Sequence, residues 1–183
     1  MKSSLRLLLS LAAFATTSAF ASAADHKSAF LDFGKISPAK NGESVEIDLD
    51  EGLLGLAALF AEGQEKEAAQ VLRGLKQVRV HVIGLDEGNR SSVLERVREI
   101  RVGLTNEGWK RVAVVKDKNG ADVAVFIRVG DGHSIQGLAI TVVDEGKQAV
   151  IVNVVGDIKP EQIAALGQRF DIDPLKKITV AKN

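Results

Sequence analysis

The chain has 183 residues with no Cys, and its 24 basic and 24 acidic residues give a formal net charge of zero. This balance excludes binding of nucleic acid or anionic membranes through bulk charge, and the lack of Cys excludes disulfides. With one Trp, no Tyr and seven Phe, the core must be built mainly from aliphatic side chains.

The first residues have the pattern of a secretory signal peptide. Lys2 and Arg6 precede the apolar run Leu7–Phe20, and Ala21-Ser22-Ala23 supplies the small residues of a cleavage site. Ser and Thr interrupt this run, whereas an uncleaved anchor needs about 20 apolar residues. We therefore expect cleavage near Ala23, no stable membrane anchor, and a protein in the periplasm or outside the cell. Losing two of the 24 basic residues against 24 acidic ones would leave a net charge of −2.

The remaining residues suit one domain, since domains commonly have about 100–150 residues. We predict a signal peptide over residues 1–23, an N-terminal arm over 24–44, a single α+β domain over 45–170 and a C-terminal tail over 171–183. The arm carries Phe30 and Phe33 in a polar setting. Apolar and acidic residues alternate over Val45–Leu49, which predicts a short strand at the edge of a sheet.

Two helical segments are predicted next. Residues 51–60 are apolar nearly all round, so a helix here must be deeply buried or covered by a partner. Apolar residues at helical spacing over 68–75 predict a second helix. Over residues 78–83 the valines instead fall at every second position, which predicts a half-buried strand.

The clearest helix is predicted over Asn89–Thr105. Its apolar residues fall on one face: Val93, Val97, Ile100 and Leu104. Ser92 and Glu95 fit a capping box near its start, and Gly108 should end it.

From Trp109 onward, strands and turns alternate. The predicted strands cover residues 110–116, 122–129, 135–143 and 148–155, and Asn119-Gly120 between the first two is a strong hairpin signal. This pattern predicts a four-strand meander. Gly156 and Asp157 should then turn the chain into a helix opened by Pro160, with Asp157 as its cap.

The order of elements predicts an α+β fold, with an antiparallel sheet of four to five strands and helices packed mainly on one face. If Val123 and Val125 face the helices, the far face is also apolar, whereas a wet sheet face should be more polar. The residues that we assign to the far face are Ala124, Phe126, Val143 and Ile151. Either the arm folds over this face, or the face binds a partner or a second copy.

Recognisable catalytic motifs are missing from the sequence. It has no phosphate loop, nucleophile elbow, zinc-binding His motif or dinucleotide fingerprint. We interpret His26 and His81 as incidental. His133 has Asp131 and Ser134 beside it, but residues so close in one loop rarely form a triad. We therefore predict no enzymatic activity, no cofactor and no metal.

A second set of residues is interpreted as structural. Trp109 should plug the end of the core rather than stack on a ligand, and Asn153 should satisfy neighbouring backbone groups. Gly156, Asp157 and Pro160 complete this structural signature.

The signal peptide, the Gly108-Trp109 step into a hairpin and the segment VIVNVVGDIKPEQI resemble DUF4252, a family of exported bacterial proteins of unknown function. The similarity covers about Phe30–Phe170, and Lys159 departs from the acidic residue expected before the last helix. The resemblance implies export from a Gram-negative bacterium and, for some members, genes near extracytoplasmic sigma-factor systems. It implies no catalytic residues.

We therefore expect a non-enzymatic domain that binds an envelope protein or forms a homodimer through the far face of the sheet. The alternative is a carrier that encloses a small apolar ligand or lipid between the sheet and residues 53–60. A hydrolase centred on His133 and Asp131 is the third hypothesis.

Overall fold

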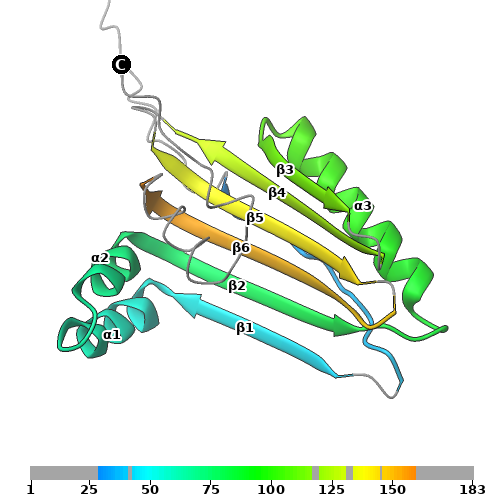
Figure 1. Ribbon diagram of the computed structural model, residues 1–183, viewed down its shortest axis with the longest axis horizontal. Helices are drawn as coiled ribbons and strands as arrows, with labels where there is room; N and C mark the ends of the chain where they lie inside the picture. The colour runs from blue at the N-terminus through cyan, green and yellow to red at the C-terminus, as the bar shows by residue number, and fades with distance from the viewer. Residues whose placement is uncertain (1–28, 41–42, 117–119, 131–133, 145, 160–183) are drawn as a thin grey trace, which may run out of the picture.

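The computed structural model describes residues 29–40, 43–116, 120–130, 134–144 and 146–159 (Figure 1). The elements follow the chain as β1 (Ser44–Asp50), α1 (Glu51–Glu62), α2 (Lys66–Gly74), β2 (Leu75–Gly84), α3 (Arg90–Asn106), β3 (Lys110–Lys116), β4 (Ala121–Val129), β5 (Ile135–Asp144) and β6 (Gln148–Ile158). The strands form one antiparallel sheet in the order β1-β2-β6-β5-β4-β3.

The α+β class and the meander β3–β6 are confirmed, but the sheet has six strands rather than four to five. The reason is that β2 pairs with β6, which adds β2 and its neighbour β1 to the same sheet. As the alternating pattern predicts, β1 is an edge strand. The other edge is β3.

The start of α3 differs from the prediction. Asn89 precedes the helix as its N-terminal flanking residue, and Ser92 lies within the first turn, where its hydroxyl donates to the Asn89 carbonyl at 2.8 Å. The capping box is therefore wrong, because Ser92 is three residues too far along the chain. The predicted end is confirmed: Gly108 has a φ of 86°, and the Trp109 N–H donates to the Leu104 carbonyl.

Strand β6 runs through the predicted Gly156-Asp157 turn and ends at Ile158. Gly156 pairs with Leu75, and a Cβ there would lie 2.4 Å from the Gly74 carbonyl oxygen. Gly156 therefore permits a close approach between β6 and the end of α2. Asp157 is a strand residue, and the helix predicted from Pro160 lies outside the described residues.

The two faces of the sheet have different covers. On one face, the arm and α3 pack against β2, β4, β5 and β6 in a single core cluster around Phe126 and Ile151. Leu54 of α1 and Leu72 of α2 belong to a second cluster with Val78, Val125 and other residues of the opposite face. Of the described helices, α1 and α2 thus pack on one face and α3 on the other.

The strand register shows that this second face is aliphatic except for one lysine at the β3 edge. Starting at β1 and ending at β3, one row is Val45, Val82, Val150, Val142, Val123 and Val115. The next is Ile47, Val80, Val152, Ile140, Val125 and Ala113. The third is Leu49, Val78, Val154, Leu138, Ile127 and, at the β3 edge, Lys110. We call this the aliphatic face and the opposite one the arm face.

Candidate interaction surface

The N-terminal arm is attached to the arm face by the side chain of Asn153. The Asn153 Oδ1 accepts from the Leu31 N–H at 3.0 Å, and its Nδ2 donates to the Ala29 carbonyl at 3.1 Å. Asn153 is only 1% exposed. Its amide therefore supplies the hydrogen bonds that these two buried backbone groups of the arm would otherwise need from a neighbouring strand or from water. The prediction that Asn153 satisfies backbone groups is confirmed, although the sequence did not identify the arm as the recipient.

Arg79 holds the arm nearer to the β1 edge. Its guanidinium lies 5.0 Å from the ring centre of Phe30 and 4.7 Å from that of Phe33, and it donates to the Leu31 carbonyl at 3.2 Å. Cation–π contacts of this kind contribute about 0.5–2 kcal/mol each, depending on desolvation. The aromatic residues of the arm thus lie over a charged part of the sheet as well as over its apolar centre.

The residues predicted to form a partner surface are all buried beneath this cover. The exposed fractions are 1% for Ala124, 0% for Phe126, 5% for Val143 and 0% for Ile151. They share one core cluster with Leu31 and Phe33 of the arm and with α3. The predicted partner surface is therefore wrong, and the alternative explanation, that the arm folds over this face, is confirmed.

Trp109 lies at the end of the same cluster and is 4% exposed. A Cβ on Gly137 would lie 2.6 Å from its Cη2 and 3.0 Å from the Cβ of Ala29. The indole ring therefore packs directly on the β5 backbone, next to the arm. This position confirms that Trp109 fills the end of the core.

His81 is a buried structural residue on the arm face. It is 7% exposed, its ring stacks against Phe33 with centroids 6.4 Å apart, and its Nε2 lies 3.3 Å from the Ser44 hydroxyl. A Ser–His pair can in principle activate a nucleophile, but Phe33 covers this imidazole. His26, Asp131 and His133 lie outside the described residues. Within the described ranges, no group of three or more His, Cys, Asp or Glu residues could hold a metal ion.

Asp86 and Asn89 form a hydrogen-bond network that holds the C-terminal end of the arm. The Asp86 carboxylate accepts from the N–H groups of Gly88, Asn89 and Lys40, and the Asn89 side chain reaches the carbonyls of Gly84 and Ser37. The Asn89 N–H lowers the pKa of Asp86 below its ordinary value; partial desolvation opposes this shift, and the N–H groups of Lys40 and Gly88 reinforce it. These polar groups are therefore occupied by the chain itself.

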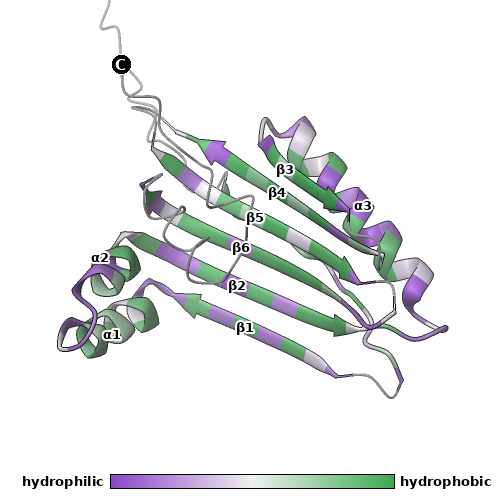
Figure 2. Cartoon of the chain, viewed as in Figure 1, coloured by the Kyte–Doolittle hydropathy of each residue, from purple (hydrophilic) through white to green (hydrophobic). Residues whose placement is uncertain are grey.

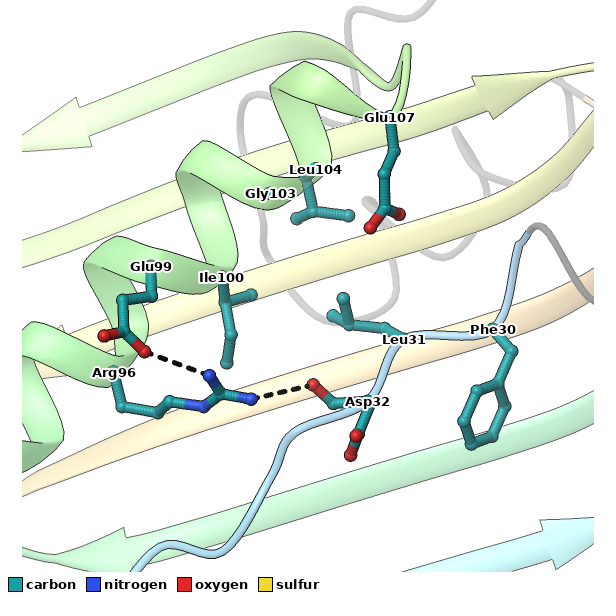
Figure 3. A pocket seen from close by; sticks show the side chains of 9 residues that line it. All are labelled: Phe30, Leu31, Asp32, Arg96, Glu99, Ile100, Gly103, Leu104 and Glu107. Atoms are coloured by element: carbon teal, nitrogen blue, oxygen red, sulfur yellow. Dashed lines mark hydrogen bonds and ion pairs between the residues drawn. The ribbon is translucent and has the colours of Figure 1, made fainter.

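A pocket of about 270 Å³ lies between the arm and α3 (Figure 3). Arg96 crosses it, donating to the carbonyls of Phe33 at 2.9 Å and Asp32 at 3.3 Å and pairing with Glu99 at 3.0 Å. The N–H groups of the Arg96 guanidinium thus join the arm to α3 and are not free to bind an anion. Ligand pockets commonly have about 300–1,000 Å³, so we interpret this one as a packing seam.

The largest exposed apolar side chains gather on α1. The exposed fraction is 83% for Phe60, 61% for Leu59, 54% for Leu56 and 49% for Leu53, while Leu54 and Ala58 are buried. Hydrophobic colour covers most of this helix (Figure 2). The sequence required a helix that is buried or partner-covered, and the described part of the chain buries only one side of it. The exposed side of α1 is therefore our candidate interaction surface.

Comparison with known proteins gives one match. The family described as "Domain of unknown function (DUF4252)" matches residues 39–166. Searches of curated proteins and of solved structures found no match. No helix among the described residues is long and apolar enough to cross a membrane.

Proposed function

Because the chain belongs to the DUF4252 family, whose description assigns no activity, we propose a function from its surfaces: a non-enzymatic domain that binds a protein partner or itself in the cell envelope. The observation that carries this proposal is the exposed apolar side of α1. Four large side chains on one 12-residue helix exceed the scattered apolar exposure of an ordinary surface.

The charges near α1 favour a protein partner over an anionic membrane. Asp50 precedes the helix as its cap, and Glu51 and Glu62 are its first and last residues. Arg73 and Lys76 already pair with Glu62 and Glu51. Helices that lie on anionic membranes carry Lys and Arg on their polar face instead. A protein groove that accepts an amphipathic helix would bury Leu56 and Phe60, which lie one helical turn apart on the exposed side.

The expected location follows from residues 1–23, which have the signal-peptide pattern. We propose export to the periplasm of a Gram-negative bacterium, with cleavage near Ala23. N-terminal sequencing of the protein from its own envelope tests this part of the proposal. An uncut N-terminus in the cytoplasmic fraction would contradict it.

The binding surface is tested with the double variant Leu56→Glu/Phe60→Glu. Both side chains are exposed, so we expect an unchanged fold by circular dichroism and a loss of partner cross-links from a photoreactive group at Leu53. Val102→Glu is the matched control, because Val102 is 55% exposed on a different helix, α3. Cross-links that persist in the α1 variant, or disappear equally in the control, would contradict a binding role for α1.

The alternative is a carrier of a small apolar ligand or lipid, which the aliphatic face favours because it offers an apolar surface next to α1. Native mass spectrometry of gently purified protein is the test. A bound lipid that is lost on Leu56→Glu/Phe60→Glu substitution would favour the carrier. A ligand-free mass together with protein cross-links would favour the binding domain.

A further inference from the structure

The two edge strands carry opposite charge on the same face of the sheet. On β1, Glu46 and Asp48 lie on the arm face, with side chains 64% and 51% exposed. On β3, Arg111 and Lys116 lie on that face, as the register from strand to strand shows. One row begins at Asp48 and ends at Arg111, and another begins at Ser44 and ends at Lys116.

The acidic edge is only partly neutralised within the chain. Arg79 lies 3.4 Å from Asp48 and 3.9 Å from Glu46, so one guanidinium serves two carboxylates. On the basic edge, Lys116 lies 3.8 Å from Asp122 and remains 76% exposed. Each edge therefore repels the same edge of a second copy, and such charges commonly prevent edge strands from pairing with one another. The acidic β1 edge and the basic β3 edge attract each other, so these charges do not prevent pairing between β1 and β3.

The strand directions also fit. Six strands alternate in direction, so β1 and β3 run opposite ways. A second copy shifted along the sheet, and rotated about the same axis so that it continues the twist, would place its β3 antiparallel to β1 with both arm faces on one side. Arg111 would then stand opposite Asp48, and Lys116 would stand diagonal to Glu46. Directly opposite and diagonal pairs are both within reach across antiparallel strands.

The aliphatic face would continue across the same junction. Strand β3 has a bulge at Val112 in its pairing with β4. If Val112 is also left unpaired at the junction, Val115 stands opposite Val45, and Ala113 stands opposite Ile47. Val45, Ile47 and Val115 are among the exposed large apolar residues, at 45%, 41% and 38%. Edge pairing would cover apolar surface and satisfy the outward-facing backbone groups of both strands.

The geometry points to head-to-tail association of this protein, in which the β3 edge of one copy adds to the β1 edge of the next. The occupant of each edge is a second copy of the chain. Such a junction uses two different surfaces and leaves one of each free at the ends, so it builds an open row of subunits rather than a closed dimer. This inference deepens the proposed self-binding function but uses a surface other than the exposed side of α1.

Charge reversal at each edge gives the test. Variant one is Glu46→Lys/Asp48→Lys, which makes both edges basic, and variant two is Arg111→Glu/Lys116→Glu, which makes both acidic. In sedimentation velocity, we expect the unsubstituted chain to form larger species as its concentration rises, and each variant alone to stay monomeric. An equal mixture of the two variants should restore the larger species, because each basic edge then meets an acidic one.

Controls separate the edges from other causes. Glu67→Lys/Glu87→Lys makes the same charge change as variant one at exposed positions away from both edges, and should associate normally. Raising the salt from about 0.1 to about 1 M shortens the Debye length from about 10 to about 3 Å and should reduce association. Variant one also places lysines beside Arg79, so thermal unfolding checks its fold; variant two leaves the Arg79 contacts intact and decides the question alone if variant one unfolds.

The outcomes distinguish this inference from the proposed function. A chain that stays monomeric at every concentration, association that persists in variant two, or two folded variants that fail to complement would overturn the head-to-tail arrangement. Leu56→Glu/Phe60→Glu should leave the larger species unchanged. If that α1 variant alone abolishes them, the chain self-associates through α1 and the edge arrangement is wrong.

Discussion

Replacing Asn153 by Leu should detach the arm while keeping the number and branching of the side-chain heavy atoms. The substitution removes the acceptor for the Leu31 N–H and the donor to the Ala29 carbonyl, both of which are buried. A buried backbone group left without a partner costs about 1–3 kcal/mol, so two such groups predict a loss of about 2–6 kcal/mol. Single domains have about 5–15 kcal/mol of stability in total, which makes this a large effect.

Urea denaturation measures the loss, and hydrogen exchange at the Leu31 amide reports whether the arm is released. Thr141→Val is the matched control, because Thr141 is 0% exposed on the same face and its hydroxyl accepts a hydrogen bond from Arg101 of α3 at 2.8 Å rather than from the arm. The control should cost about 0.5–1.5 kcal/mol and leave exchange at Leu31 unchanged. A loss below about 0.5 kcal/mol for Asn153→Leu, or a larger loss without faster exchange at Leu31, would refute the anchoring role.

Three further substitutions test other parts of the fold. Gly137→Ala should destabilise the protein by about 1–3 kcal/mol in thermal unfolding, since the new methyl group would overlap the ring of Trp109. Gly103→Ala should instead stabilise it by about 0.5–1 kcal/mol, because a Cβ there meets no atom within 4 Å in the helix interior. Because the pKa of Asp86 is lowered in the folded protein, its carboxylate stabilises the fold at pH values above the ordinary aspartate pKa of about 4. This stabilisation disappears as the pH falls through the lowered pKa. Asp86→Asn should therefore lower the urea midpoint at neutral pH and flatten its decrease between about pH 5 and pH 2; an unchanged pH profile would contradict this.

Strands and helices could be predicted because their signals are local. The alternation over Val45–Leu49 and the apolar spacing of α3 depend only on neighbouring residues, and both elements occur where those patterns lie. The number of strands in the sheet could not be predicted in this way. The pairing of β2 with β6 joins residues about seventy positions apart, and nothing in either strand's own period specifies that partner.

The assignment of faces failed for a related reason. In β4, alternation separates Val125 from Phe126 correctly, and they belong to different clusters. The alternation does not show which of the two groups of residues α3 covers, because both groups are apolar and either could face the helix. The sequence contained one usable signal, Asn153 within a Val-rich strand. A buried amide needs hydrogen-bond partners, and here the arm supplies two of them.

The difference between the two faces follows from where the polar anchors lie. Asn153, Arg79 and Asp86 each bond to the arm and fix it over one face, and Arg96 of α3 completes this cover. The aliphatic face lacks side-chain amides or guanidinium groups in its three central rows, so a segment placed on it would gain apolar burial without a directional bond to set its position. A face of this kind favours association that is positioned elsewhere, by the exposed side of α1 or by the charged rows of the two edges. It is at those places, rather than at Phe126, that substitutions should change what this protein binds.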